Sequence, residues 1–384
     1  MTRTVKLTVI CASMILCMFL LSACGFLGGS SGDSDTGGTN TKKSGMALVY
    51  SPVSEGDPIF NAPALDGVKD YAAASGKTYK TYMPTGASDS QKLAAINAAL
   101  SGGADTVICY GPDFTAILAD PAGSNPNVKF IVIDEDLTPA VMNIAAVPFR
   151  SEQAGYIAGY AAVKEGYRNL GFIGSGSGSS VSLYGWGFVQ GANAAATELK
   201  LPKDVAGAVN IKYSYAGIYA LAADIKAKAG DWFRDSSEPT DLIFAAGGTL
   251  YESVAAAASE YNAANSPALK KIVIASDTDR SGASQDILTS AIKGVKPAIK
   301  YMLKIRYESD FPGGKVVTAL GAAIDGAIGI PKDTWRFKNF DTTEYDNIIR
   351  DMKNNNIDVR SNKDFNPSKM SATDAPGINV RYRA

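Results

Sequence analysis

Short apolar runs alternate along this chain with longer segments in which apolar residues recur every three or four positions. The short runs lack a regular polar face, which is typical of strands buried on both sides in a parallel sheet. They lie at residues 46–50, 106–110, 129–133, 170–173, 209–215, 242–246 and 272–275. The pattern therefore predicts an α/β fold.

The longer segments predict amphipathic helices between successive strands. They lie at residues 64–74, 91–100, 151–163, 187–199, 220–229, 251–261 and 287–305. Each helix is expected to return the chain to a parallel strand through a right-handed connection. The segment 353–384 is expected to form polar, partly irregular surface.

The roughly 340 residues after position 45 exceed the usual size of one hydrophobic core, so two lobes are expected. No polar linker interrupts the middle of the chain, which favours strands that cross between the lobes. We expect lobe 1 over residues 46–148 and about 277–318, and lobe 2 over residues 149–276 and about 319–384. A ligand cleft is expected at the carboxyl ends of both sheets.

The N-terminus predicts a secretory signal peptide over residues 1–23. Arg3 and Lys6 precede an apolar run at 7–21, which is too short and wrongly flanked for a stable membrane span. The sequence LSAC at 21–24 looks like a bacterial lipobox, in which Cys24 would be diacylated. The alternative is an ordinary signal peptide whose cysteine is incidental.

Residues 24–45 are rich in Gly, Ser, Thr, Asp and Lys, which predicts a flexible tether behind the lipid anchor. Such a protein would be held at the extracytoplasmic face of the cell membrane by its lipids. The globular part would then lie outside the cell.

Composition excludes several classes of function. Without residues 1–23 the chain carries 35 Lys and Arg against 38 Asp and Glu, which is no signature of a nucleic-acid surface. The chain has no histidine, so Ser-His and Cys-His nucleophile pairs and His-ligated zinc are excluded. Cys109 is the one cysteine after Cys24, so we expect it to be a buried, unpaired side chain.

A glycine-serine run at residues 174–179 follows a predicted strand but lacks the third glycine of a dinucleotide-binding loop. It predicts a flexible strand-to-helix turn at the cleft rim. Phosphate-loop and nucleophile-elbow motifs are also missing from the sequence, and we expect neither a cofactor nor a metal.

Two aspartates stand where predicted strands end. Asp134 follows residues 130–133, and Asp277 follows residues 272–276, so both are expected to face the cleft. A carboxylate can accept hydrogen bonds from vicinal hydroxyls such as those of ribose. The alternative for each is a helix cap or a turn residue. Lys293, expected within the helix after Asp277, would by itself be an ordinary surface lysine.

Aromatic side chains concentrate where loops are expected, and a flat ring needs aromatic faces to stack on. They are Phe60, Phe114, Tyr184, Trp186, Tyr215 and Tyr219. Several of them are expected to belong simply to the core.

A series of short motifs occurs in a fixed order along residues 46–329. They are GDPIFN at 56–61, FIVID at 130–134, FRSEQAGYIAG at 149–159, GFIG at 171–174, GFVQGA at 187–192, AGGT at 246–249, and SDTD at 276–279 with LTSAIK at 288–293. Together they resemble the basic membrane protein family, the purine-nucleoside-receptor-like substrate-binding lipoproteins of ABC importers.

This resemblance implies a two-lobed type I periplasmic-binding-protein fold, each lobe a parallel sheet flanked by helices, with the ligand between the lobes. It implies a set of ligand-binding residues: Asp134, Asp277 and Lys293 on the ribose, Asp57 and Asn61 on the base or sugar edge, Phe60 and Tyr219 on the two faces of the base, and Gly247 in the AGGT motif. Hinge closure over the ligand would create the form that a permease recognises.

Three positions depart from the family pattern near the expected cleft. Arg280 stands where the family usually has glutamine, Leu250 stands where it has glycine, and the opening aspartate of the first loop is replaced within residues 51–55. These departures bear on the identity of the ligand and not on the fold.

We predict a monomeric, lipid-anchored, non-catalytic substrate-binding protein that delivers a nucleoside, with purines favoured, to the permease of an ABC importer. Three alternatives stay open. The ligand is a sugar or a signalling metabolite; the chain is a surface sensor or adhesin; or it is a hydrolase that uses Asp134 and Asp277 as acid and base.

Overall fold

The computed structural model describes residues 45–50, 57–111, 114–137, 141–218, 222–317, 321–371 and 373–383. These residues belong to one unit formed by residues 43–384. The predicted signal peptide, Cys24 and all of the tether except Gly45 lie outside the described residues, as does Tyr219.

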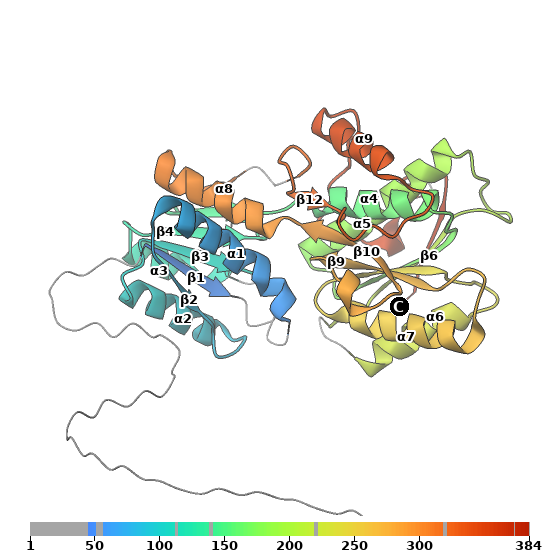
Figure 1. Cartoon of the computed structure of the whole chain (residues 1–384), viewed down its shortest axis with the longest axis horizontal. Coiled ribbons are helices and arrows are strands. Elements are labelled where there is room, and N and C mark those ends of the chain that lie inside the picture. The colour runs from blue at the N-terminus through green and yellow to red at the C-terminus, as the bar shows by residue number, and fades with distance from the viewer. Residues whose placement is uncertain are drawn as a thin grey trace, which may run out of the picture. The chain divides into compact units, whose positions relative to one another are not determined.

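The first sheet contains six parallel strands in the order β11-β5-β4-β3-β1-β2 (Figure 1). Their bounds are β1 Met46–Tyr50, β2 Tyr79–Tyr82, β3 Thr106–Tyr110, β4 Lys129–Ile133, β5 Ile144–Val147 and β11 Lys315–Val316. Alternate residues of β1 face opposite sides, yet Ala47 and Leu48 are equally inaccessible to solvent. This burial on both faces explains the unbroken apolar run.

Helices cover both faces of the first sheet. Leu48 packs in one cluster with α1 (Pro58–Ser75) and α8 (Val295–Glu308). Ala47 packs in another with α2 (Asp89–Ser101) and α3 (Ala119–Ser124). A short 3-10 helix, η2 (Thr115–Ile117), precedes α3. Cys109 lies in the second cluster, buried and unpaired as predicted, and burial raises the pKa of its thiol.

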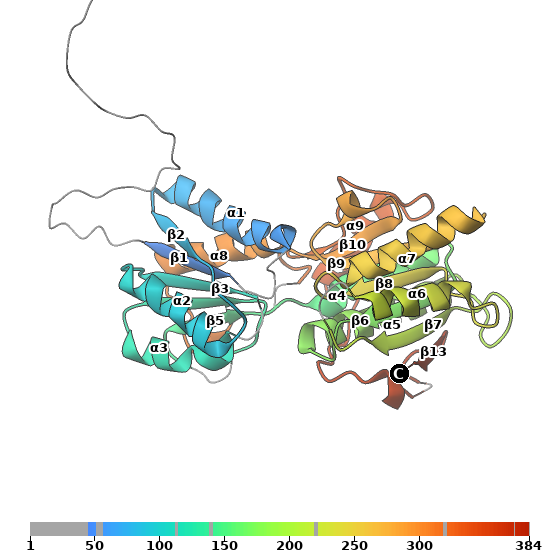
Figure 2. The ribbon, with the colours of Figure 1, turned by 90° about the horizontal axis from the view of Figure 1, so that it is seen from below.

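The second sheet has the order β12-β10-β9-β8-β6-β7-β13, with β12 antiparallel to β10 and the other pairs parallel. Its strands are β6 Asn169–Gly174, β7 Asn210–Tyr215, β8 Leu242–Ala246, β9 Ile272–Asp277, β10 Ile287–Lys293, β12 Ile328–Gly329 and β13 Asn379–Tyr382. Figure 2 shows the sheet from below, with β13 at its edge beside β7.

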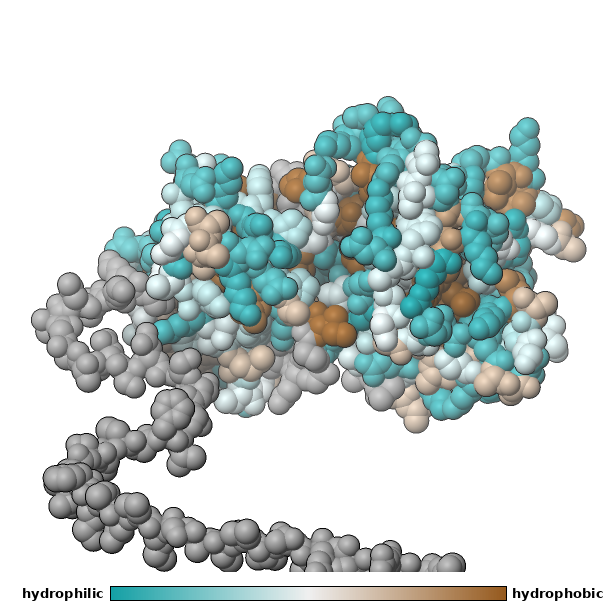
Figure 3. Space-filling view, in the orientation of Figure 1, coloured by the Kyte–Doolittle hydropathy of each residue, from teal (hydrophilic) through white to brown (hydrophobic). Residues whose placement is uncertain are grey.

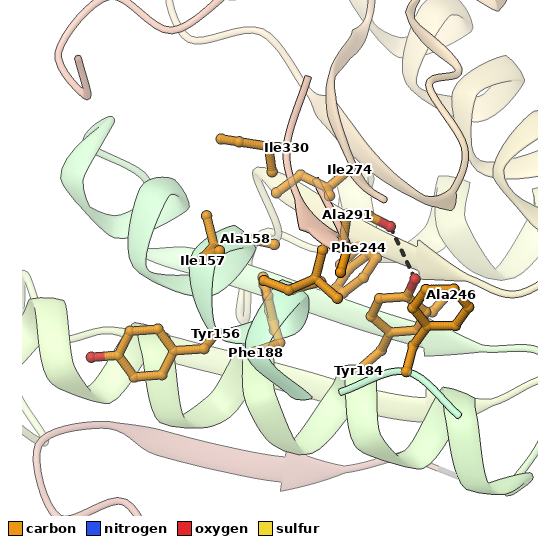
Figure 4. Packing of buried hydrophobic residues seen from close by; sticks show 14 of the residues in the cluster. Tyr156, Ile157, Ala158, Tyr184, Phe188, Phe244, Ala246, Ile274, Ala291 and Ile330 are labelled. Atoms are coloured by element: carbon orange, nitrogen blue, oxygen red, sulfur yellow. Dashed lines mark hydrogen bonds between the residues drawn. The ribbon is translucent and has the colours of Figure 1, made fainter. Parts of the chain in front are cut away.

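Four helices cover the second sheet, two on each face. They are α4 (Ser151–Lys164) and α5 (Ser179–Glu198) on one face, and α6 (Ala223–Arg234) and α7 (Leu250–Asn265) on the other. On the α4–α5 face, Phe188 of α5 packs against Phe244 of β8 and Ile157 lies in the same cluster (Figure 4). Beyond them are α9 (Thr342–Lys353) and two 3-10 helices, η3 (Ser281–Ala283) and η4 (Pro367–Lys369).

The seven predicted strands are confirmed, and the glycine-serine run is a strand-to-helix turn between β6 and α5. The predicted helix at 287–305 was wrong in its first part. Residues 287–293 form β10, Gly294 follows, and the helix begins at Val295. Strand pairing therefore puts 287–293 in the second sheet, so the chain returns to the first sheet after Lys293 and not at about residue 277.

The C-terminal segment is more ordered than the expected polar surface. Asn379–Tyr382 pairs with β7 along the edge of the second sheet.

The surface seen in Figure 3 is mostly hydrophilic, with hydrophobic residues in small separate groups. Among the described residues no helix is long and apolar enough to cross a membrane.

Candidate functional site at the carboxyl ends of the two sheets

Asp134 and Asp277 occupy corresponding places in the two sheets. Asp134 directly follows β4 of the first sheet, and Asp277 is the last residue of β9 in the second sheet. Both have left-handed backbone angles, with φ of 76° and 71°. Residues other than glycine rarely adopt this conformation, and such strain is concentrated at functional sites.

Lys293 brings the two aspartates together. Its ammonium nitrogen lies 2.8 Å from Oδ2 of Asp134, 3.1 Å from Oδ1 of Asp277 and 2.7 Å from Oγ of Ser180 in α5. The lysine side chain is only 3 % exposed. We call Asp134, Asp277 and Lys293 the carboxylate–lysine cluster. Lys293 ends β10, so the expectation that it lies in a helix was wrong, although it joins the residues predicted to surround it.

The two carboxylates differ in their electrostatics. Burial is the largest influence on each and favours the neutral acid. For Asp134, burial and the charge of Asp277 outweigh Lys293, so its pKa lies above the ordinary value. For Asp277, burial is outweighed by the charge and hydrogen bond of Lys293, a hydrogen bond from Ser276 and the charge of Arg280, so its pKa lies below the ordinary value.

The lysine stays charged in this setting. Burial alone would lower the pKa of Lys293, but the charges and hydrogen bonds of both aspartates raise it above the ordinary value. One ammonium therefore faces two carboxylates. Their remaining acceptor capacity suits neutral hydroxyl donors better than a further anion.

Tyr184 of α5 contacts two members of the cluster, Asp277 and Lys293. Its hydroxyl donates to the carbonyl of Ala291 in β10 at 3.1 Å (Figure 4) and lies 3.4 Å from Oδ1 of Asp277. The Lys293 ammonium lies 5.1 Å from the Tyr184 ring centroid, within the range of a cation–π contact. Tyr184 therefore fixes β10 and its terminal lysine against α5.

A second ionic contact joins residues that flank the two sheets. Asp57 caps the N-terminus of α1, where its carboxylate accepts from the Phe60 amide at 3.2 Å. Arg280, between β9 and η3, donates Nη1 and Nη2 to the two carboxylate oxygens of Asp57, each at 2.7 Å. The Arg280 side chain is fully buried. Asp57 was predicted to bind ligand directly, and the structure pairs it with the residue noted as a departure from the family pattern.

Phe60 lies in the first turn of α1 and stacks on Tyr110, the last residue of β3, with ring centroids 4.8 Å apart and planes 15° apart. Burial, followed by the charges of Asp134 and Asp277, holds the pKa of Tyr110 well above its usual value. Tyr110 therefore lies near both Phe60 and the two aspartates of the cluster. Asn61 follows Phe60 in α1, and the structure does not test its predicted contact with a ligand.

Gly247 directly follows β8, beside the end of β9. Its φ is 102°, and its amide donates to Oγ of Ser276 at 2.8 Å. A side chain at this position would lie 2.1 Å from Oγ of Ser175, so the site requires glycine. Ser175 Oγ and Thr278 Oγ1 are buried without a hydrogen-bond partner in the described part of the chain. Polar atoms left unpaired at strand ends are suited to meet a polar ligand.

A cleft of about 320 Å³ opens beside the cluster. Asp134 and Ser180 line it, together with Arg150 and Glu152 at the start of α4 and Lys363 of the C-terminal segment. The Lys363 ammonium also pairs with Asp136 across this opening. The described part of the C-terminal segment thus contributes to the rim.

Sequence reasoning missed Tyr110, Ser180 and Ser276. Tyr110 ends a confirmed strand, so the rule that selected Asp134 and Asp277 could have selected it. Ser180 and Ser276 carried no signal of their own, because their roles depend on how α5 and β8 approach β9 and β10. No cluster of potential metal ligands occurs among the described residues.

A family model described as "ABC transporter substrate-binding protein PnrA-like" matches residues 43–363. The chain belongs to this family, Bmp. The match includes both sheets up to β12 and every residue of the carboxylate–lysine cluster. Members are substrate-binding proteins of ABC transporters, which implies a small-molecule ligand and permease partners.

Curated relatives carry the family name. This Bmp-family chain is 25 % identical over 287 residues to the "ABC transporter nucleoside-binding protein BmpA" of Lactococcus lactis subsp. cremoris, covering 71 % of this chain and 77 % of the relative. It is also 25 % identical over 356 residues to "Basic membrane protein A" of Borreliella burgdorferi, covering 91 % of this chain and 96 % of the relative.

Solved structures support the fold of this family member. An ABC transporter solute-binding protein from Aeropyrum pernix aligns with a TM-score of 0.62 at 18 % identity, covering 81 % of this chain and 86 % of that one. A solute-binding protein from Conexibacter woesei also aligns with a TM-score of 0.62 at 18 % identity, covering 82 % and 98 %. The predicted periplasmic-binding-protein-like fold is confirmed.

Proposed function

We propose that this chain is the lipid-anchored receptor of an ABC importer and binds a nucleoside, with purines favoured, between its two sheets. The observation that carries the proposal is the carboxylate–lysine cluster. It combines one carboxylate from the first sheet with a carboxylate and an ammonium from the second, at the carboxyl ends of parallel strands.

The cluster suits a vicinal diol. Asp134 and Asp277 would accept from the ribose 2′ and 3′ hydroxyls, while Lys293 holds both carboxylates and offsets part of their charge. Because the pKa of Asp134 is raised, its ionised form has the most to gain from new hydrogen-bond donors. A ligand that lacks one hydroxyl would leave a buried acceptor without a donor.

The base would then lie toward Phe60 and Tyr110. Phe60 supplies one aromatic face, and we propose Tyr219 as the other. Asn61 and the amide of Gly247 would contact the edges of the ligand. The nucleoside-binding name of the relative from Lactococcus lactis supports this class of ligand.

Ligand capture would be coupled to closure of the two sheets about the strands that cross between them. In the structure Asp134 and Asp57 each contact a basic residue associated with the second sheet. Ligand hydroxyls that join these contacts would favour the closed form, which the permease would then recognise.

Thermal melting against a ligand panel tests the function. A soluble form that starts at Gly45 is melted with ribonucleosides, free bases and sugars at matched concentrations. A bound ligand at a hundred times its Kd adds about 2.7 kcal/mol to the free energy of unfolding. We expect ribonucleosides to raise Tm more than free bases or sugars. A shift with sugars alone would favour the sugar-binding alternative, and conversion of the bound ligand on long incubation would favour a hydrolase.

The proposed anchor has its own test. Cys24→Ser is expected to abolish incorporation of labelled palmitate in a bacterial host and to release the protein from the membrane fraction, because the thiol would carry the lipid. The matched control is Cys17→Ser, within the predicted signal peptide, which keeps Cys24. Membrane retention of the Cys24→Ser protein would contradict the lipobox interpretation.

A further inference from the structure

Arg280 is held from several sides between the two sheets. Its backbone amide donates to Oγ of Ser290 in β10 at 3.0 Å, and its guanidinium lies 4.9 Å from the ring centroid of Tyr251 in α7. Its terminal nitrogens bind both oxygens of Asp57. An arginine fixed by a bidentate pair and an aromatic face holds its other N–H groups in fixed directions.

The guanidinium nitrogen that takes no part in this pair is Nε. It is fully buried and has no hydrogen-bond partner among the described residues. Arginine cannot accept a hydrogen bond, so only an acceptor can satisfy this nitrogen. A buried donor without a partner is unfavourable, which makes the position one that a ligand acceptor would improve.

Asp57 has correspondingly little to offer a ligand donor. Its two oxygens already accept from Nη1 and Nη2 of Arg280, and one also accepts from the Phe60 amide. An unpaired aspartate here would attract an amino group on the ligand. The Asp57–Arg280 pair reverses this preference, because it presents a donor where an acceptor would otherwise stand.

The pair lies close to the proposed ribose site. Arg280 is three residues beyond Asp277 in the sequence. Ser290 of β10, which accepts from the Arg280 amide, pairs with Ala275 of β9, two residues before Asp277. The charges of Arg280 and Asp57, like those of Asp134 and Asp277, act on the hydroxyl of Tyr110, which stacks on Phe60. A ligand with its ribose on the cluster and its base on Phe60 would bring a base edge to Arg280.

We infer, on the basis of the proposed function, that Arg280 selects nucleosides whose base carries a carbonyl oxygen in place of an exocyclic amine. The receptor would prefer 6-oxopurine nucleosides such as inosine to 6-aminopurine nucleosides such as adenosine, and uridine to cytidine. Arg280 Nε–H donates to the carbonyl oxygen. An exocyclic amine would place its own N–H donors against Nε–H, and no hydrogen bond would form.

Calorimetric titration of the full chain in mild detergent with inosine, adenosine, uridine and cytidine tests the inference. We expect at least tenfold tighter Kd for the carbonyl member of each pair. Arg280→Gln supplies a group that both donates and accepts and leaves Asp57 able to accept, so this preference should fall about tenfold. The exposed Arg234→Gln in α6 is the matched control and should leave the preference unchanged.

Arg280→Gln leaves Asp57 without its buried partner and could fail to fold, so the double variant Asp57→Asn/Arg280→Gln removes both charges together and should also lose the preference. The comparison of the four nucleosides on the unaltered chain tests the inference even if neither variant folds. Equal binding within the pairs, or tighter binding of adenosine and cytidine, overturns the inference and leaves the proposed function standing. Failure of all four nucleosides to bind overturns both.

Discussion

Asp134 and Asp277 bring the same functional group to one lysine, yet the fold treats them differently. Burial raises the pKa of both carboxyls. For Asp277 it is outweighed by Lys293, Ser276 and Arg280, whereas for Asp134 burial and the charge of Asp277 outweigh Lys293. The lowered pKa of Asp277 means that its ionised form stabilises the fold. The raised pKa of Asp134 means that its ionised form is tolerated at a cost.

Asparagine replacements should separate the two residues. We expect Asp277→Asn to lower the free energy of unfolding at pH 7 by about 1–3 kcal/mol, because a buried charged hydrogen bond is lost while Lys293 keeps Asp134. Asp134→Asn should leave it unchanged within about 1 kcal/mol or raise it, because a disfavoured charge disappears. Urea unfolding measures both, with the exposed Asp325→Asn as the matched control.

The pH dependence follows from the directions of the two shifts. The contribution of Asp277 is present above its unfolded-state pKa and is lost as pH falls through its lower folded-state pKa. The contribution of Asp134 is present below its unfolded-state pKa and is lost as pH rises through its higher folded-state pKa. Any advantage of Asp134→Asn at pH 7 should therefore shrink as the pH is lowered. An advantage that grows on acidification would contradict the assignment.

At this scale the sequence predicted the members of the cluster but not the partner of Asp57. Strand-end position singles out Asp134 and Asp277, because the carboxyl edge of a parallel sheet is where its ligands bind. The contact between Asp57 and Arg280 joins residues 223 positions apart. It depends on how two separate sheets meet, which no local pattern encodes.

Among the elements, α4 and α5 pack with their backbones in close contact. A Cβ atom at Gly155 or Gly159 of α4 would lie 2.2 or 2.1 Å from carbonyl oxygens of α5. At Gly187 or Gly191 of α5 it would lie 1.9 Å from carbonyl oxygens of α4. These glycines lie within two of the motifs that carried the family resemblance, so their place in those motifs reflects helix packing.

Gly159→Ala should lower the free energy of unfolding by about 1–3 kcal/mol, because the two backbones must separate to admit the methyl group. Gly123→Ala in α3 is the matched control. No atom lies within 4 Å of the added carbon there, so stability should hold or rise by about 0.4–1 kcal/mol. Denaturant unfolding gives both values, and equal stability of the two variants would contradict the packing argument.

Element prediction succeeded for seven strands of five or six residues and failed for the shorter strands and for β10. Strands such as β3 and β8 are entirely buried and read as apolar runs. β2 is at an edge and half exposed, and β11 and β12 have two residues each, so their patterns are too weak to detect. Residues 287–293 merged with the helix that follows because apolar residues recur through both segments, and the glycine between them gave the only boundary.

At the scale of the whole molecule, both sheets contribute to one polar site. The first sheet supplies Asp134 and, through α1, Asp57 and Phe60, while the second supplies Asp277 and Lys293. A site divided in this way binds ligand fully only when the two sheets are close together. The family resemblance implied this division between the sheets, and we propose that the departure at Arg280 sets the selectivity for the base.

The most direct test of nucleoside binding is calorimetric titration of the soluble form with a ribonucleoside and its 2′-deoxy counterpart. We predict that the ribonucleoside binds about 5- to 150-fold more tightly, since loss of one hydroxyl leaves a buried carboxylate without a donor at about 1–3 kcal/mol. Asp277→Asn should reduce that ratio. Equal affinity for the two ligands, or failure of both to bind, would contradict the assignment of the carboxylate–lysine cluster as a ribose site.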